Sequence, residues 1–273
     1  MPRMTENDAV FSFQDRRGRV EVAFTDRFGG MSGGPFAQLN LRVPEPSQAA
    51  LVYSENEDTV AENMDILAYA MDRGGEATGE DAFEPPVGGS KVKRIVAMHQ
   101  VHGADVTVVD DRPHPDPTSD GLVTTTAGVI LAPRAADCVP VLIADPDRGV
   151  VGAAHAGRKG MVAGVVPRTI AMMHELGATD LVAWVGPHAC GRCYEVPAEM
   201  RQAVADEIPQ SWAETSWGTA SVDLGAGIAA QLEAEGAEVI ALGHCTIEDD
   251  RYYSYRRDGQ DTGRQAGLIW VRP

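Results

Sequence analysis

Two apolar runs rich in β-branched residues stand close together in the middle of the chain, CVPVLIAD (138–145) and GVVGAAHA (149–156). A short segment containing a Pro-Asp pair separates them, so we expect an antiparallel hairpin. Parallel neighbours need a long crossover between them, usually a helix. A chain built around this hairpin is therefore not a simple alternation of strands and helices in a doubly wound sheet.

The rest of the chain mixes both kinds of element without strict alternation. Helical periodicity begins near residue 58, where Thr59 and Glu62 form a capping-box pattern. A helix over 161–176 contains Pro167, which predicts a kink or a late start. The other predicted helices are 196–208 and 222–236, and the other predicted strands are 19–25, 94–101, 104–110, 180–186, 238–245, 252–257 and 266–272.

These elements predict an α/β (α+β) fold, a single domain over 1–273 with mixed β-sheets packed in layers with helices. The polar, Gly/Pro-rich segment 73–91 is expected to be an exposed loop within it. The formal net charge of -17 argues against a general nucleic-acid binder. Without a long apolar stretch or a signal-type start, we expect a cytoplasmic protein that does not enter the membrane.

Residues capable of metal chemistry fall at the ends of predicted strands. His99 and His102 lie in MHQVHG, Cys138 follows AAD, and His155 lies in AAHAG. Two imidazoles and a thiolate are what an open zinc site needs, with the fourth position left for water or substrate. The same residues also allow a copper site, a Cys138 nucleophile activated by a histidine, or simply buried side chains.

Two further groups attract attention. Arg158 and Lys159 follow His155 near a predicted helix start, where an anion can dock. Near the end, SYRRDGQDTGRQAG (254–267) contains three arginines that suggest a phosphate clamp, Arg256, Arg257 and Arg264, although pairing with nearby aspartates is the simpler interpretation. The cysteines of HACGRC and GHCT suggest a second metal site, but a lone C-x-x-C motif is weak evidence.

Taken together, several blocks resemble the laccase-domain (YfiH-like) family. They are FTDRFGGMSGGPFAQLNL (24–41), MHQVHGADV (98–106), SDGLVTTTAGVILAPRAADCVPVLIAD (119–145), VVGAAHAGRKG (150–160), VGPHACGRCYEV (185–196) and CTIEDDRYYSYRRDGQDTGRQAGLIWV (245–271). The resemblance implies layered mixed sheets and a zinc held by His102, Cys138 and His155. It also implies phosphorolysis of adenosine, inosine, guanosine and methylthioadenosine, with deamination of adenosine.

The resemblance also suggests roles around the metal. His99 is the candidate for proton transfer, with Cys138 as a catalytic metal ligand, while Arg158 or Arg256 would hold phosphate and Asn40 would contact ribose or base. Asp137 is a candidate for orienting a ligand, and equally for forming a turn. Many relatives have a tryptophan where this chain has Arg158, so a stacking contact is replaced by a charge.

Other interpretations remain open at this point. Some members of the family are linked to peptidoglycan-precursor editing or to copper-dependent phenol oxidation. Seven histidines are too few for a four-copper oxidase, although copper can still bind the same three ligands. A metal-stabilised interaction module is the alternative outside enzymes, and it would be expected to have four protein ligands.

Overall fold

Two mixed β-sheets form the centre of the protein in a computed structural model that describes residues 10–42, 56–73 and 90–273. The first sheet runs β1 (Phe11–Arg17), β2 (Val20–Thr25), β14 (Gln265–Val271), β6 (Val129–Leu131) and β3 (Arg94–Val96), and β7 (Arg134–Ala135) pairs with β14. The second runs β13 (Glu238–Ala241), β10 (Val182–Val185), β8 (Val139–Asp145), β9 (Val150–Ala156), β5 (Gly121–Thr124) and β4 (Val106–Val108).

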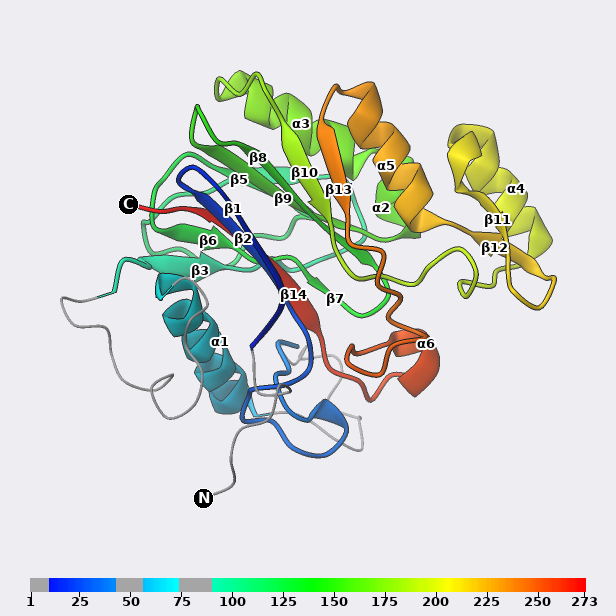
Figure 1. Ribbon diagram of the computed structural model, residues 1–273, viewed down its shortest axis with the longest axis horizontal. Coiled ribbons are helices and arrows are strands. Elements are labelled where there is room, and N and C mark those ends of the chain that lie inside the picture. The colour runs from blue at the N-terminus through cyan, green and yellow to red at the C-terminus, as the bar shows by residue number, and fades with distance from the viewer. Residues whose placement is uncertain (1–9, 43–55, 74–89) are drawn as a thin grey trace.

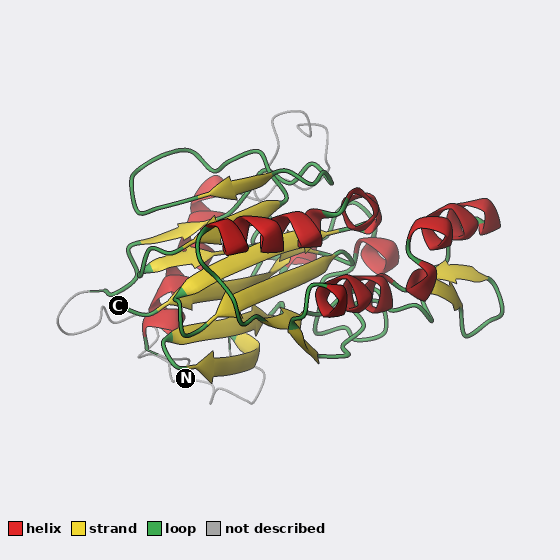
Figure 2. Cartoon of the chain, turned by 90° about the horizontal axis from the view of Figure 1, so that it is seen from above, coloured by secondary structure: helices red, strands yellow, loops and turns green. Residues whose placement is uncertain are grey.

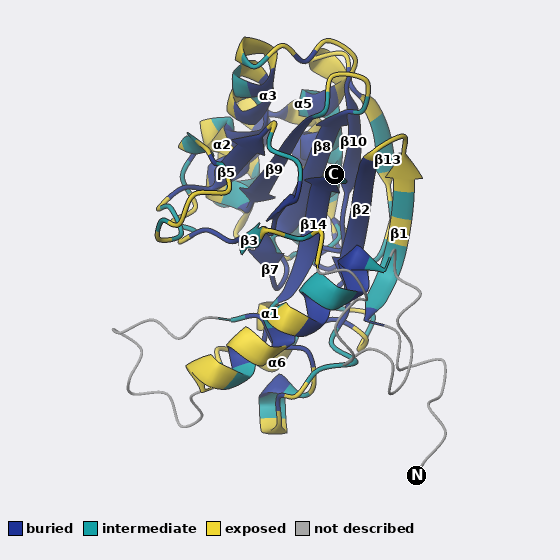
Figure 3. Cartoon of the chain, turned by 90° about the vertical axis from the view of Figure 1, so that its left-hand side faces the viewer, coloured by how far each residue is buried: buried dark blue, intermediate teal, exposed yellow. Residues whose placement is uncertain are grey.

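The sheets lie between two layers of helices (Figures 1 and 3). Helix α1 (Glu57–Asp72) covers the outer face of the first sheet, while α2 (Arg158–Ala163), α3 (Val165–Glu175) and α5 (Leu224–Ala234) cover the second. Helix α4 (Ala198–Glu207) and the ribbon of β11 (Trp212–Glu214) and β12 (Ala220–Val222) extend from one end (Figure 2). The predicted mixed, layered α/β fold is confirmed.

Strands buried on both faces explain the apolar runs of the sequence. On β8, Val141 packs toward the helices and Leu142 packs between the sheets. On β14, Ile269 packs between the sheets and Trp270 packs toward α1. The predicted hairpin is confirmed, since β8 and β9 pair antiparallel from Val139 with Ala156 to Asp145 with Val150. This register places Cys138, just before Val139, and His155, opposite Pro140, at the same end of the hairpin.

Several local predictions were wrong. Asn56 caps α1 by accepting from the Asp58 N–H, so the predicted Thr59 and Glu62 pair lies inside the helix. The predicted interruption of 161–176 is present, but it comes at Gly164 and not at Pro167, because the left-handed φ of 80° of Gly164 separates α2 from α3. Segment 252–257 is not a strand, because Ser254 caps the short α6 (Tyr255–Asp258).

Most of the predicted loop near 73–91 lies outside the described residues. Among the helices that the structure describes, none is long and apolar enough to cross a membrane.

Candidate active site

A cavity of about 510 Å³ opens at the ends of β8 and β9 that carry Cys138 and His155. Residues from both sheets and from three helices line it, so it forms where the layers meet. Its lining residues are Arg42, His99, Gln100, His102, Arg134, Ala135, Ala136, Asp137, Cys138, His155, Arg158, Tyr194, Leu224, Tyr255, Arg256 and Arg264.

The structure brings the three predicted metal ligands together at this cavity. One ligand atom from each of His102, Cys138 and His155 lies within 4.8 Å of the other two. The hairpin explains half of this convergence, because Cys138 directly precedes β8 and His155 lies on β9 opposite Pro140. His102 arrives from the connection between β3 and β4 with a left-handed φ of 59°.

Asp120 holds the two ligand histidines, His102 and His155, in place. This fully buried carboxylate accepts from Nδ1 of His155 at 2.8 Å, so Nε2 is the ring nitrogen left for a metal. It also accepts from the backbone N–H groups of Val101, His102 and Gly103 at 2.7 to 3.1 Å. A carboxylate behind a ligating histidine is a common feature of metal sites, since it fixes the ring orientation.

Gly157 leaves the space into which the ligands point. A Cβ at this position would lie 2.8 Å from Sγ of Cys138 and 2.8 Å from Nδ1 of His102. The donor set of two imidazoles and one thiolate suits zinc or copper. Together with Asp120, this cradle shows that the residues present fit a metal ion.

Two of the three ligand residues, Cys138 and His155, form a coupled charge pair. Burial raises the pKa of the Cys138 thiol, but the charge of His155 and hydrogen bonds from both histidines outweigh burial and lower the pKa to about 6. Burial lowers the pKa of His155, but the charge of Cys138 and the hydrogen bond to Asp120 outweigh burial and raise it to about 9. Without a metal the pair is therefore a thiolate beside an imidazolium, and His155 must lose its Nε2 proton when a metal binds. His102 is exposed toward the cavity side of the site, which gives small molecules access to this face.

Three arginines, Arg42, Arg134 and Arg264, form another part of the cavity lining, called the arginine wall below. Arg264 stands directly before β14, and Arg42 and Arg134 line the cavity beside it. Burial lowers the pKa of Arg264 to about 10, and the charge of Arg42 acts in the same direction. Among the described residues Arg264 makes no ion pair, and its Nη1 donates to the carbonyls of Thr262 and Gly263. Such a concentration of positive charge makes this wall suited to an anion.

Asn40 lies behind this wall, fully buried and not among the lining residues. Its Oδ1 accepts at 2.9 Å from the backbone N–H groups of Arg42 and of Arg264. The predicted direct contact with ribose or base does not fit this burial. Asn40 instead ties together the two segments that carry the arginines.

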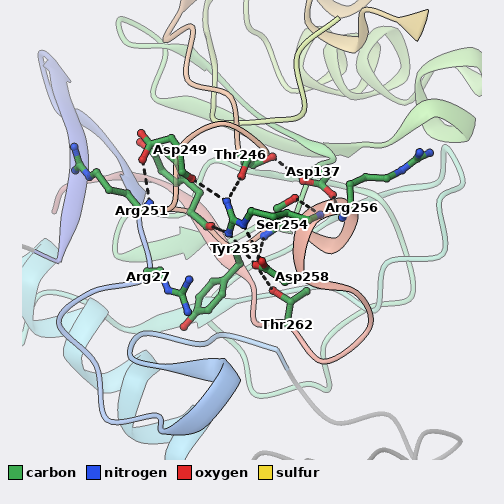
Figure 4. A network of polar contacts seen from close by, with 12 residues as sticks. Arg27, Asp137, Thr246, Asp249, Arg251, Tyr253, Ser254, Arg256, Asp258 and Thr262 are labelled. Carbon is green, nitrogen blue, oxygen red and sulfur yellow. Dashed lines mark hydrogen bonds and ion pairs between the residues drawn. The ribbon is translucent and has the colours of Figure 1, made fainter. Parts of the chain in front are cut away.

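Asp137, next to the metal ligand Cys138, connects this part of the cavity to the segments that carry Thr246 and Arg256 (Figure 4). With a φ of 85°, it accepts from Oγ1 of Thr246 at 2.7 Å and from the backbone N–H of Arg256 at 2.6 Å. The Arg256 guanidinium lies 4.6 Å from the centre of the Tyr194 ring and donates to the Glu195 carbonyl. The predicted ligand-orienting role of Asp137 thus becomes a role in holding the cavity wall.

The other predicted residues divide between the cavity and its surroundings. His99 and Arg158 line it, whereas Lys159 is exposed and is not among the lining residues. Arg257 turns away and donates to the carbonyls of Thr246, Asp249 and Tyr252, so it does not belong to a phosphate clamp.

Several lining residues had no role in the sequence interpretation, among them two arginines and two tyrosines: Arg42, Arg134, Tyr194 and Tyr255. An arginine inside the apolar stretch VILAPRAADC was the signal for one of them. Arg134 is buried, with its guanidinium donating to the carbonyls of Leu41 and Met98. The two tyrosines supply aromatic surface to the cavity that Arg158 also lines.

Comparison with known proteins places the chain in a family. Residues 85–272 match the family described as multi-copper polyphenol oxidoreductase laccase. The chain belongs to this family. It is 45% identical over 259 residues to a purine nucleoside phosphorylase of Streptomyces coelicolor, covering 92% of this chain and 96% of that protein. It is 39% identical over 268 residues to a protein of that name from Corynebacterium glutamicum, covering 95% and 98% of the two chains.

Solved structures support the fold. YlmD of Geobacillus stearothermophilus superimposes with a TM-score of 0.75 at 30% identity, covering 97% of this chain and all of that chain. A Neisseria meningitidis protein of the family DUF152 gives the same TM-score at 28% identity and the same coverage. The layered arrangement described above is therefore shared within the family.

Proposed function

We propose that this protein is a zinc-dependent purine nucleoside phosphorylase that acts in the cytoplasm on adenosine, inosine, guanosine and methylthioadenosine. Its relatives over nearly the whole chain are named purine nucleoside phosphorylases. The observation that carries the proposal is the half-buried guanidinium of Arg264, which makes no ion pair among the described residues, at a cavity that also contains the metal cradle. A phosphorylase needs this combination of an anion site and a polar reaction site in one cavity.

Phosphate binding is assigned to the arginine wall. Arg264 beside β14, Arg134 on β7 and Arg42 from the segment after β2 would contact the anion. Arg158 on α2 and Arg256 on α6 would add positive charge to the same cavity. Asn40 acts on the substrate indirectly, by fixing the backbone that carries two of these arginines. Such fixed charges stabilise the phosphate as it attacks C1′ of the ribose.

The purine lies on the tyrosine side of the cavity. Tyr194 and Tyr255 provide flat apolar surface for the base. As the bond from C1′ to N9 breaks, the departing purine needs a proton, and His99 is the cavity residue assigned to deliver it. The phosphate becomes ribose 1-phosphate, and the base leaves neutral.

His102, Cys138 and His155 would hold the metal, and zinc is the ion that best suits one thiolate with two imidazoles at an open site. When bound, the metal would supply a Lewis acid at the cavity wall. In this proposal Cys138 contributes to catalysis only as a ligand of that metal. Copper at the same ligands is the alternative that a phenol oxidase would need.

Adenosine deamination is proposed as a second activity because His102 is exposed at the metal cradle. Water therefore has access to the same region as His99. In this reaction water replaces the amino group at C6, and His99 transfers the proton to the leaving ammonia.

The experiment follows adenosine with and without phosphate in zinc-loaded enzyme. We expect adenine only when phosphate is present, and inosine in either condition. Production of neither would contradict the proposal. Release of an amino acid from a peptidoglycan precursor, or oxidation of a phenol after copper loading, would instead favour the corresponding alternative.

Arg264→Gln tests the anion site directly. Losing a charged hydrogen-bond donor to phosphate is expected to cost about 3 kcal/mol, or roughly a 100-fold lower kcat/KM for phosphate. Inosine formation should change little, because it uses no phosphate. Arg168→Gln removes an exposed charge on α3 and serves as the matched control. Equal loss of both activities in Arg264→Gln, at unchanged zinc content, would contradict this assignment.

A further inference from the structure

A second cluster of metal-ligating side chains lies apart from the residues that line the cavity. It consists of Cys190, Cys193, Cys245 and Glu248, whose ligand atoms all lie within 4.8 Å of one another. None of these residues lines the cavity, and the three thiols are free. We propose that this cluster binds a structural zinc ion, separate from the catalytic centre.

The fold brings the four residues together from two segments. Strands β10 and β13 run parallel, so the segments that follow them leave the same edge of the second sheet side by side. His188 and Cys245 form a parallel bridge at this point. The backbone N–H of Cys190 points to Sγ of Cys245 at 3.5 Å. The convergence therefore follows from strand pairing and not from a chance approach of surface loops.

The C-x-x-C segment is a tight turn. The Cys193 N–H donates to the Cys190 carbonyl at 2.9 Å, which brings both side chains to the same side. Gly191 is required in this turn, because a Cβ there would lie 2.6 Å from Oδ2 of Asp223. A closed turn with two cysteines, plus a third cysteine from a neighbouring segment, matches the ligand arrangement of structural zinc sites.

Glu248 completes the set of four ligands. Its Oε2 lies 3.9 Å from Sγ of Cys190 and 3.2 Å from Nη2 of Arg192. Arg192 and Glu248 are both well exposed, so their ion pair contributes little and is easily exchanged for a metal bond. Three sulfur ligands and one carboxylate close a tetrahedral shell, which distinguishes this site from the open catalytic one.

The cluster lies next to residues that support one wall of the cavity. Tyr194 follows Cys193 directly and forms the cavity wall on which the Arg256 guanidinium rests. On the other segment, Thr246 follows Cys245 and bonds Asp137. An ion that joins the two cysteine segments would therefore hold Tyr194 and Thr246 in place. Through them it would fix the position of Arg256 without contacting the substrate.

Zinc content of the full-length protein tests the proposal. We expect about two zinc ions per wild-type chain and about one in the His102→Ala/Cys138→Ala variant, which keeps the cluster. Cys190→Ser/Cys245→Ser should likewise keep one, at the catalytic centre. Arg192→Ala changes the same turn without removing a ligand, so it should retain both ions. A zinc-free His102→Ala/Cys138→Ala variant that is folded by circular dichroism would overturn the proposal.

Cobalt provides a second, spectroscopic readout of the same variants. In the His102→Ala/Cys138→Ala background, one cobalt ion bound with a strong thiolate-to-cobalt charge-transfer band would support a three-cysteine site. The band should be about three times as intense per ion as that of Cys190→Ser/Cys245→Ser, whose remaining site has one thiolate. A disulfide among these cysteines in protein purified under reducing conditions, found by mass spectrometry, would overturn the proposal.

Discussion

Asp120→Ala is expected to lower the free energy of unfolding by about 3 to 5 kcal/mol and to weaken metal binding at least 10- to 100-fold. The carboxylate accepts three backbone N–H groups from the loop that carries His102, together with Nδ1 of His155. All of these donors lose their acceptor in the variant. Burial raises the pKa of Asp120, but its hydrogen bonds to His155 and Gly103 outweigh burial, so the carboxyl stays charged.

Denaturant unfolding and zinc titration of the purified variant measure these two effects. Asp105→Ala is the matched control, because it removes an exposed carboxylate from the same connection. Asp120→Asn keeps the shape and one acceptor oxygen, and it should fall between wild type and Asp120→Ala in both measurements. Wild-type zinc affinity in Asp120→Ala would contradict the role assigned to this carboxylate.

Gly157→Ala is expected to abolish most of the zinc-dependent activity while leaving the fold intact. The new Cβ would lie 2.8 Å from both Sγ of Cys138 and Nδ1 of His102. At φ -77° and ψ 173° any residue adopts this backbone conformation, so the change is a steric one at the ligands. Loss of a hydrogen-bond partner of a metal ligand typically lowers metal affinity by about 10- to 100-fold. Displacing the ligands themselves should lower it at least as much, so we expect zinc affinity to fall by about 100-fold or more.

Zinc titration, kcat and thermal unfolding of the metal-free protein separate the outcomes. Gly33→Ala is the control, since its φ is -116° and no heavy atom lies within 4 Å of the new Cβ. Both variants should unfold at the same temperature as wild type without metal. A Gly157→Ala variant with wild-type zinc affinity would show that the ligands do not approach this position during binding.

Local patterns predicted the parts of the site that depend on local pairing. The hairpin of β8 and β9 is defined by two apolar runs and a short turn, and it places Cys138 and His155 at one end. His102 required the family resemblance, because no local spacing connects it to the other two. The Asp120 network, which brings it in, joins side-chain and backbone groups 17 to 35 residues apart.

The arginine wall was largely missed because it depends on distant strand pairing. Arg134 reaches the cavity since β7 pairs with β14, which lies more than 100 residues further along the chain. The error at 252–257 has a different cause. Tyr252 and Tyr253 are fully buried, as in a strand, but the hydroxyl of Ser254 accepts from the Arg257 N–H and starts a helical turn. A single side-chain hydrogen bond outweighed the apolar pattern there.

The two walls of the cavity belong to different sheets. Cys138 and His155 are fixed by the β8–β9 hairpin, whereas Arg134 and Arg264 are fixed by β7 and the start of β14. Under the proposed function, Arg134 and Arg264 would contact the phosphate from the first sheet, and the hairpin of the second sheet would hold two of the metal ligands. Substitutions of Arg134 or Arg264 would therefore change anion binding from the first sheet while leaving Cys138 and His155 in place on the second.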